Sequence, residues 1–277
     1  MSNLPYFDLL IDERQDGGET GQLWEHHVHW GYWEQPKAAD GTRADYVAAM
    51  EHMNGVLLAA GHVANGQRLL DVGCGFGGTI QQINAEYANM HLTGLNIDPR
   101  QLAAAEAQTR ATNGNQIAWV EGDACELPFE DNSFDCILAV ECIFHFPSRE
   151  RFLAEAARVL KPGGYLAVSD FLPPITFFGR TPFWAMIRPR IAKSYGMLGK
   201  VPLRSYKVMG KRAGMQLEEN RNIRKNTLPT YPFLIKFFRE QGSEDAQKTM
   251  IVGTRWMKWL SKIGLIQYRV YTFHKPA

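Results

Sequence analysis

Residues 69–79 read Leu-Leu-Asp-Val-Gly-Cys-Gly-Phe-Gly-Gly-Thr, and this stretch decides the fold. Its apolar start predicts a buried strand, its glycines predict a tight turn, and Thr79 begins a helix. Glycine has no side chain, so such a turn lets a nucleotide-like ligand approach bare backbone. The stretch therefore predicts an α/β protein with a ligand at the carboxyl end of its first strand.

Two cofactors fit this turn. Gly73, Gly75 and Gly78 match the GxGxxG of dinucleotide-binding proteins. Residues 71–75 also match the DxGxG that holds S-adenosylmethionine. Residues elsewhere in the chain have to separate the two.

Composition is that of an ordinary globular protein. The chain has 277 residues, 45% hydrophobic and 21% charged, with a formal net charge of +1 that carries no nucleic-acid signal. Cys74, Cys125, Cys136 and Cys142 form no CxxC pair, so we expect reduced thiols in the cytoplasm. No apolar run approaches the ~18 residues of a membrane span, and residues 1–18 do not resemble a signal peptide.

The pattern along the chain divides it into four parts. From residue 67 strands and helices alternate, which implies right-handed crossovers and a parallel sheet, and after Asp170 the alternation breaks. Strands are predicted at 68–72, 91–95, 116–121, 134–140, 165–170, 215–222 and 267–274. Helices are predicted at 45–62, 79–87, 99 to near 113, 148–160, 231–240 and 243–263. We expect an N-terminal helical cap (1–65), a cofactor-binding core (66–172), a helical lid (173–214) and a completion of the core (215–277).

Two carboxylates favour S-adenosylmethionine over NAD. Asp71 ends the first strand, where it can hold the amino group of a bound amino acid, which NAD lacks. Asp123 ends the third strand and can accept from an exocyclic amine, while the N–H that follows donates to a ring nitrogen of adenine. Asn96 at the end of the second strand can reach a ribose under either interpretation.

These motifs resemble, in order and spacing, those of the class I S-adenosylmethionine-dependent methyltransferases over residues 66–172. The resemblance implies a doubly wound, Rossmann-like α/β fold with a seven-stranded, mostly parallel sheet whose last strand is antiparallel. Residues 93–101, with Asn96 replacing the usual acidic ribose ligand, are similar to a subgroup that includes γ-tocopherol C-methyltransferases, sarcosine/dimethylglycine N-methyltransferases and rebeccamycin-type sugar O-methyltransferases. Residues 29–33 also resemble this subgroup, whose N-terminal segment folds over the cofactor. The cofactor-binding residues implied are Asp71, Gly73, Gly75, Gly77, Asn96, Ile97, Gln101, Asp123, Ala124, Glu141, Trp30 and Tyr32.

His145 is the candidate base. It follows the fourth strand, whose carboxyl end meets the same crevice as Asp71. Methyl transfer is an SN2 displacement that needs in-line alignment and, for a hydroxyl acceptor, removal of a proton. In the sugar O-methyltransferases that the chain resembles, a His and an Asp act together, which assigns catalysis to His145 and Asp170. His26, His27 and His29 have no carboxylate or cysteine at ligand spacing, so we expect no metal.

The acceptor is expected to be a small molecule. Residues 171–217 hold nine basic residues, no acidic ones and interleaved aromatics. This pattern fits a solvated basic face, an anionic or lipophilic acceptor, or a peripheral contact with an anionic membrane. It leaves C-, N- and O-methylation open. We expect the chain to be a monomer or a homodimer. The alternatives are a NAD-dependent oxidoreductase, an RNA or protein methyltransferase, and a binding module that keeps the pocket; without a nucleic-acid-binding module we expect no nucleic-acid partner.

Overall fold

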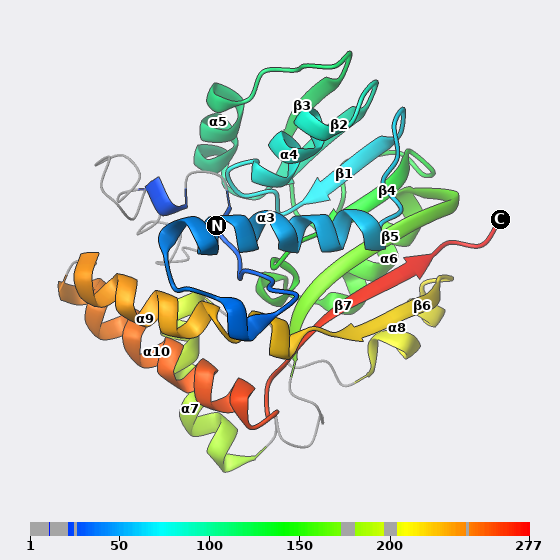
Figure 1. Ribbon diagram of the computed structural model, residues 1–277. Coiled ribbons are helices and arrows are strands. Elements are labelled where there is room, and N and C mark those ends of the chain that lie inside the picture. Colours follow the sequence, from blue (N-terminus) through cyan, green and yellow to red (C-terminus); the bar gives the residue numbers. More distant parts are fainter. Residues whose placement is uncertain (1–10, 12–21, 25–26, 173–180, 197–203, 242–243) are drawn as a thin grey trace.

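The centre of the molecule is a seven-stranded sheet in the order β3-β2-β1-β4-β5-β7-β6 (Figure 1). The first five strands run parallel, and β7 runs antiparallel to both β5 and β6. This confirms the predicted doubly wound sheet with an antiparallel last strand. The strands are β1 (Arg68–Val72), β2 (His91–Asn96), β3 (Gln116–Glu121), β4 (Phe134–Ala139), β5 (Leu160–Leu172), β6 (Gln216–Asn222) and β7 (Gln267–His274).

The computed structural model describes most of the chain. The described residues are 11, 22–24, 27–172, 181–196, 204–241 and 244–277, with backbone alone for 244–246. Among the predicted features, His26, Phe177, Phe178, Arg180 and Lys200 lie outside this part.

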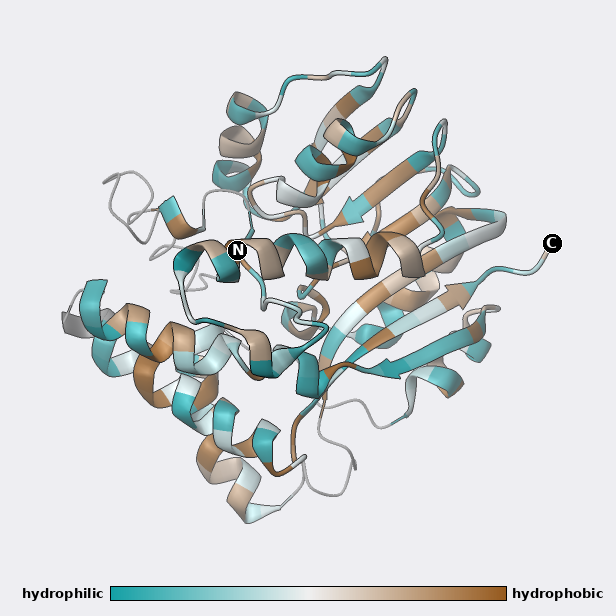
Figure 2. Cartoon of the chain, in the orientation of Figure 1, coloured by the Kyte–Doolittle hydropathy of each residue, from teal (hydrophilic) through white to brown (hydrophobic). Residues whose placement is uncertain are grey.

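Apolar cores cover both faces of the sheet. Successive strand residues point to opposite faces, so Leu69 of β1 joins one core and Leu70 the other, and Cys136 and Ile137 of β4 divide in the same way. This two-sided burial is the reason for the continuous apolar run in β4. The edge strand β6 is instead hydrophilic (Figure 2), which discourages pairing with another chain.

Helices supply these two cores. Residues of α3 and α4 pack in one core, and residues of α6 and α8 pack in the other. The helices are α3 (Arg43–Ala60), α4 (Gly78–Glu86), α5 (Pro99–Gln108), α6 (Arg149–Val159), α7 (Pro182–Tyr195), α8 (Tyr206–Arg212), α9 (Thr230–Gln241) and α10 (Glu244–Lys262). Three short 3-10 helices are η1 (Pro36–Ala38), η2 (Ile143–His145) and η4 (Arg224–Thr227).

Helices α7, α9 and α10 pack together beside the sheet, and we call them the lid helices (Figure 1). Of the three, only α7 lies within the predicted lid at residues 173–214, whereas α9 and α10 lie within the predicted completion of the core. Where α7 and α10 cross, the Ser194 hydroxyl donates to the Thr249 carbonyl over 2.8 Å. A Cβ atom at Gly253 would lie only 1.9 Å from Ser194 Oγ, so the crossing requires glycine there. The lid helices therefore pack on one another as closely as a protein core.

The two largest differences from the predicted boundaries are the end of α5 and the start of β5, while the other predicted boundaries agree within two residues. Helix α5 ends at Gln108 and not near Asn113, because the side chain of Asn84 binds the carbonyl of Arg110 and the N–H of Thr112 and so holds that segment out of the helix. Strand β5 begins directly after α6, at Leu160, because Leu160 pairs with Phe134 before a register shift that spans the Pro-Gly-Gly run.

Residues 27–33, which we call the strap, cross the carboxyl end of the sheet without forming a helix. The N–H of Tyr32 donates to the Ala49 carbonyl of α3 over 2.7 Å. The backbone of Trp33 exchanges two hydrogen bonds with Asn226 of η4. The strap is thus tied to elements on both sides of the sheet edge.

Candidate active site

The turn after β1 uses left-handed backbone at its glycines. Gly73, Gly75 and Gly77 have φ of +71°, +55° and +83°, values that favour glycine strongly. A Cβ atom at Gly75 would meet nothing within 4 Å, so this residue borders open space. A Cβ atom at Gly77 would lie 2.7 Å from the ring of Trp119, so Gly77 is needed for packing.

A cavity of about 280 Å³ opens above this turn. Its wall is formed by the carboxyl ends of β1 to β4, the start of α4 and the strap. No Lys or Arg is among the lining residues. They are His27, Val28, His29, Asp71, Gly73, Cys74, Gly75, Phe76, Gly78, Thr79, Leu95, Asn96, Ile97, Gln101, Gly122, Asp123, Ala124, Val140, Glu141, Cys142, His145, Phe146 and Pro147.

Asp71 presents a buried carboxyl group to this cavity. Its exposed fraction is 1%, and its Oδ2 atom has no hydrogen-bond partner among the described residues. Burial raises the pKa of Asp71 from 3.8 to about 8. A buried carboxyl without a partner is costly, and a ligand with a cationic group would remove that cost.

The ends of β2 and β3 form the far wall of the cavity. The Asn96 side chain donates to Gln101 Oε1, and Ile97 is a half-exposed apolar side chain beside it. Asp123 Oδ1 accepts from the N–H of Cys125 over 2.8 Å. Polar groups that suit ribose thus lie next to an apolar edge and a carboxylate that suit an adenine ring.

Glu141 ties the strap to the sheet. One of its oxygens accepts from the Trp30 N–H over 2.8 Å and also from the Tyr268 hydroxyl. Burial raises the pKa of Glu141 to about 8, against the lowering effect of these two hydrogen bonds. Its φ of +49° is left-handed, which for a glutamate marks a position held by its surroundings.

Trp30 and Tyr32, expected to line the cofactor pocket, are not in the cavity wall. The Trp30 ring is buried against Phe171, Tyr195 and Tyr231, with centroids 5.1 to 5.9 Å apart, because its backbone is anchored on Glu141. Gly77, predicted to face the cofactor, is likewise absent from the wall because Trp119 packs on it, and Gly78 lines the cavity instead.

The strap lines the cavity with His27, Val28 and His29, two of which are histidines that the sequence analysis had considered only for metal binding. His29 Nδ1 lies 3.1 Å from the Trp30 carbonyl, which can only accept, so Nδ1 carries the proton. Its Nε2 atom has no partner among the described residues, and burial lowers the pKa of His29 to about 4. The described residues contain no group of three or more potential ligands with metal-binding geometry. The sequence feature that indicates a place for His27 and His29 in the cavity wall is their polarity within an otherwise aromatic segment.

His145 is in the cavity wall, at the end of η2. Its Nδ1 atom lies 2.8 Å from the Gly196 carbonyl at the end of α7, so Nδ1 carries the proton and Nε2 is the proton-accepting nitrogen. Burial and then the nearby Arg149 charge lower the pKa of His145 to about 4, although the Gly196 carbonyl opposes this. The imidazole is therefore neutral at physiological pH.

Asp170, expected to assist His145, instead binds Arg149 and Tyr206. Its oxygens accept from Arg149 over 2.7 and 3.0 Å and from the Tyr206 hydroxyl over 2.7 Å. The carboxylate is fully buried and is absent from the cavity wall. The position of Asp170 on β5 determines its pairing with Arg149. The Asp170 side chain points toward α6 and α8, where the buried Arg149 guanidinium needs a counter-charge.

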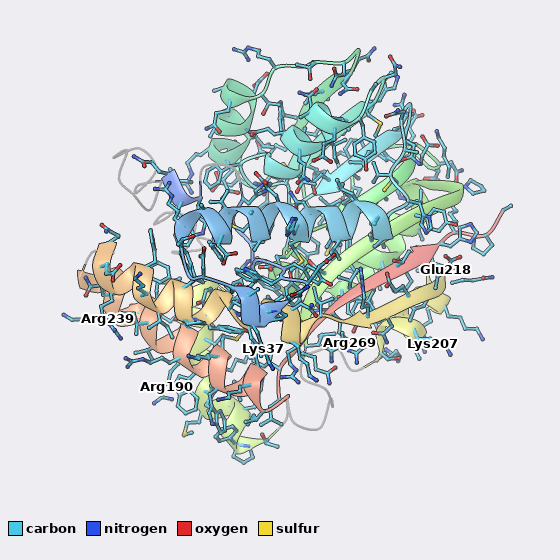
Figure 3. All side chains as sticks on the ribbon, viewed as in Figure 1. Lys37, Arg190, Lys207, Glu218, Arg239 and Arg269 are labelled. Atoms are coloured by element: carbon cyan, nitrogen blue, oxygen red, sulfur yellow. The ribbon has the colours of Figure 1, made fainter. Side chains whose placement is uncertain are left out.

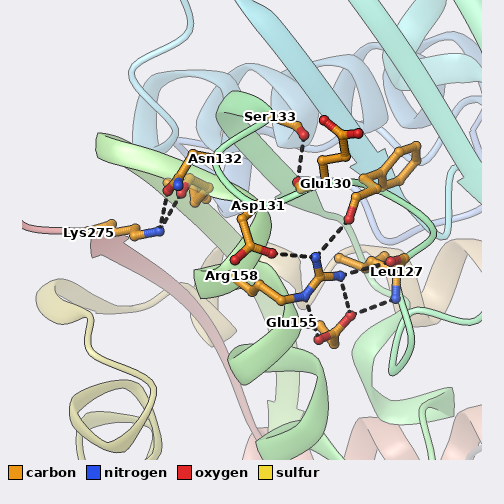
Figure 4. Close-up of polar contacts among 10 residues, drawn as sticks. Leu127, Glu130, Asp131, Asn132, Ser133, Glu155, Arg158 and Lys275 are labelled. Carbon is orange, nitrogen blue, oxygen red and sulfur yellow. Dashed lines mark hydrogen bonds and ion pairs between the residues drawn. The ribbon is translucent and has the colours of Figure 1, made fainter.

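We expect Asp170→Asn to destabilise the fold by about 3–5 kcal/mol, because it leaves the Arg149 charge buried without a counter-charge. The matched control is Asp131→Asn. Asp131 pairs with Arg158 over 2.9 Å at the surface, where 68% of the Asp131 side chain is exposed. In the variant Arg158 still has its ion pair with Glu155 (Figure 4). The control should cost below about 1 kcal/mol in urea unfolding. Equal losses in the two variants would show that the Asp170 cluster is not a buried ion pair of this kind.

Comparisons with known proteins identify the family of the chain. Residues 70–168 match the family model described as a methyltransferase domain. The chain is 31% identical over 266 residues to the 27-O-demethylrifamycin SV methyltransferase of Amycolatopsis mediterranei, covering 92% of each protein. It is 30% identical over 217 residues to a methyltransferase of Streptomyces halstedii, covering 76% of this chain and 74% of that protein. A proposed sarcosine dimethylglycine methyltransferase of Galdieria sulphuraria has the same fold, with a TM-score of 0.78 at 22% identity, over 96% of this chain and 98% of that one.

The chain belongs to the class I S-adenosylmethionine-dependent methyltransferases. It is an enzyme, and its cofactor is S-adenosylmethionine. The wall described above fits that cofactor, because an open glycine turn adjoins a buried carboxyl whose Oδ2 atom has no partner among the described residues, and no Lys or Arg from the described part of the chain lines the cavity.

Proposed function

We propose that this enzyme methylates a hydroxyl oxygen of a small lipophilic metabolite, with His145 as general base. The observation that carries the proposal is the His145 tautomer: the Gly196 carbonyl holds the proton on Nδ1 and leaves Nε2 to accept one at the cavity. The 27-O-demethylrifamycin SV methyltransferase, named for an oxygen acceptor, supports the choice of oxygen.

An aromatic cluster beside His145 supports a lipophilic acceptor. The ring of Phe144 lies 4.4 Å from that of His145 and 5.9 Å from that of Phe171. From Phe171 the cluster continues through Trp30 to Tyr195 of α7 and Tyr231 of α9. Phe146, two residues after Phe144, carries its ring in the cavity wall itself, so an apolar acceptor held near His145 would meet aromatic surface there.

The proposed cofactor contacts divide by strand end. Asp71 would hold the ammonium group of the cofactor, and the backbone at Gly73 and Gly75 would lie against its chain. Asn96 and Gln101 would bind the ribose hydroxyls. Ile97, Asp123 and Ala124 would enclose the adenine, and Glu141 would fix the strap over the methionine end. When bound, S-adenosylmethionine supplies an electrophilic methyl group on a cationic sulfur.

In this proposal His145 acts on the acceptor hydroxyl and not on the cofactor. With a pKa of about 4, its Nε2 atom is free of a proton at any physiological pH. A base this weak takes the hydroxyl proton only as that oxygen loses electron density, so its main contribution is to orient the hydroxyl and then accept the proton. The four buried free thiols, Cys74, Cys125, Cys136 and Cys142, support a reducing, cytoplasmic setting.

Ligand-induced stabilisation separates this function from the dinucleotide alternative. We expect saturating S-adenosylhomocysteine to raise the melting temperature by about 5 °C, since a ligand at about 100 times its Kd stabilises by about 2.7 kcal/mol. NADH should give no shift, because it has no ammonium group to offer the buried carboxyl of Asp71. Stabilisation by NADH alone would overturn the assignment, and methyl uptake by RNA or protein instead of hydroxylated lipophiles would overturn the proposed acceptor.

A further inference from the structure

The outer side of α10 carries cations and apolar side chains in one stripe. Lys248, Val252, Arg255, Trp259 and Ile263 follow one another at intervals of three or four residues, the spacing of one helix face. All five are exposed, and Val252, Trp259 and Ile263 keep 44%, 44% and 50% of their surface in solvent. A tryptophan and an isoleucine exposed to this extent beside cations are unusual on a solvated helix.

Helix α7 extends the same surface. Met186 is 52% exposed, and Arg188, Arg190 and Lys193 are exposed as well. Figure 3 shows Arg190 on the lid helices, far from Lys207 of α8. Residues 182–195 hold three basic residues and residues 247–262 hold four, and neither segment has an Asp or Glu. The two acidic residues of α10, Glu244 and Asp245, are confined to its first turn.

A groove joins the two helices. It is lined by Phe183, Val252, Arg255, Trp256 and Trp259, and the rings of Phe183 and Trp259 meet edge to face at 6.1 Å. The close crossing at Gly253 and Ser194 fixes the helices to each other. The apolar side chains and the cations are thus presented together by a rigid support, without any rearrangement.

We propose that this face of α7 and α10 docks on an anionic phospholipid bilayer. The seven basic residues of these two segments, which contain no Asp or Glu, complement anionic headgroups, and each contributes about 1 kcal/mol near such a surface. Trp259, Ile263 and Met186 are side chains that enter the boundary between headgroups and acyl chains. No helix in the described part of the chain has the length and apolar character of a membrane span, so the contact is peripheral.

Vesicle co-sedimentation tests the proposal. The full chain should bind vesicles of phosphatidylcholine with phosphatidylglycerol, and not vesicles of phosphatidylcholine alone. The triple variant Arg255→Gln, Lys258→Gln, Lys262→Gln should bind at least about tenfold more weakly. The matched control removes three exposed cations of α8, as Lys207→Gln, Lys211→Gln, Arg212→Gln, and should stay within about twofold of wild type.

Trp259→Gln isolates the apolar contribution. It should weaken vesicle binding most at high salt, where charge attraction is screened. The stabilisation by S-adenosylhomocysteine should be unchanged in all variants, which shows that they are folded. Two vesicle results would overturn the proposal: equal losses of binding in the α8 and α10 triple variants, or no binding to anionic vesicles. So would a dimer in solution whose interface buries Trp259, or α10-dependent binding of duplex DNA without vesicle binding.

Discussion

Asp71→Asn is expected to weaken the binding of S-adenosylhomocysteine about 100-fold or more. The reason is that asparagine occupies the same space but cannot supply the buried carboxylate that would face the ammonium group of the cofactor. Truncating one partner of a buried charge pair costs about 2–5 kcal/mol. Isothermal titration calorimetry of the two proteins measures the effect. Asp131→Asn is the matched control and should leave the affinity unchanged, because this carboxylate is exposed at the surface and lies outside the cavity wall.

The same substitution should stabilise the protein without cofactor. The pKa of Asp71 in the folded protein, about 8, lies above its ordinary value of 3.8. Its contribution to stability is therefore fully present below about pH 4 and is lost as the pH rises through 8. At pH 8 to 9 Asp71→Asn should melt about 3 °C or more above wild type, and near pH 4 the difference should vanish. A lower melting temperature together with unchanged ligand affinity would refute this role for Asp71.

His145→Ala is expected to lower kcat by about 100-fold or more, with the affinity for S-adenosylhomocysteine within about twofold of wild type. The side chain acts on the acceptor and not on the cofactor, so the loss should appear in turnover. Because the pKa of His145 is about 4, this base should add no inflection to the rate between pH 6 and 9.

The control for this prediction is His91→Ala, an exposed histidine at the start of β2. It should leave both kcat and cofactor affinity unchanged. His145→Gln retains a polar side chain of similar reach but cannot take a proton, so it should be nearly as slow as His145→Ala. Full turnover in either His145 variant would exclude proton removal by this residue.

The strand bounds could be predicted closely because short runs of strand-forming residues are separated by turn residues and helical patterns. The observed bounds of β1, β3 and β7 are those expected from the sequence alone. The end of α5 was not predictable in the same way, because it depends on the side chain of Asn84, which lies outside that helix. Nor was the early start of β5, since the pairing of Leu160 with Phe134 is long-range.

The candidate site was predictable where strand ends create it. Parallel strands bring their carboxyl ends to one edge of the sheet, and five site residues lie at or shortly after such ends: Asp71, Asn96, Asp123, Glu141 and His145. The side-chain orientations of the strap were harder to predict from the sequence, because they are set by partners remote in sequence such as Glu141 and Asn226. Asp170 also lies near the carboxyl end of a strand, but its carboxylate is paired with the buried guanidinium of Arg149 and does not reach the cavity.

Proton release on cofactor binding tests the central claim that the buried carboxyl of Asp71 receives the cationic end of the cofactor. Calorimetric titration of S-adenosylhomocysteine at pH 7, in buffers of different ionisation enthalpy, counts these protons. With a pKa of about 8 the free Asp71 is largely protonated, so wild type should release about one proton per site. Glu141→Gln should still release about one. Tight binding by wild type without proton release would contradict the claim.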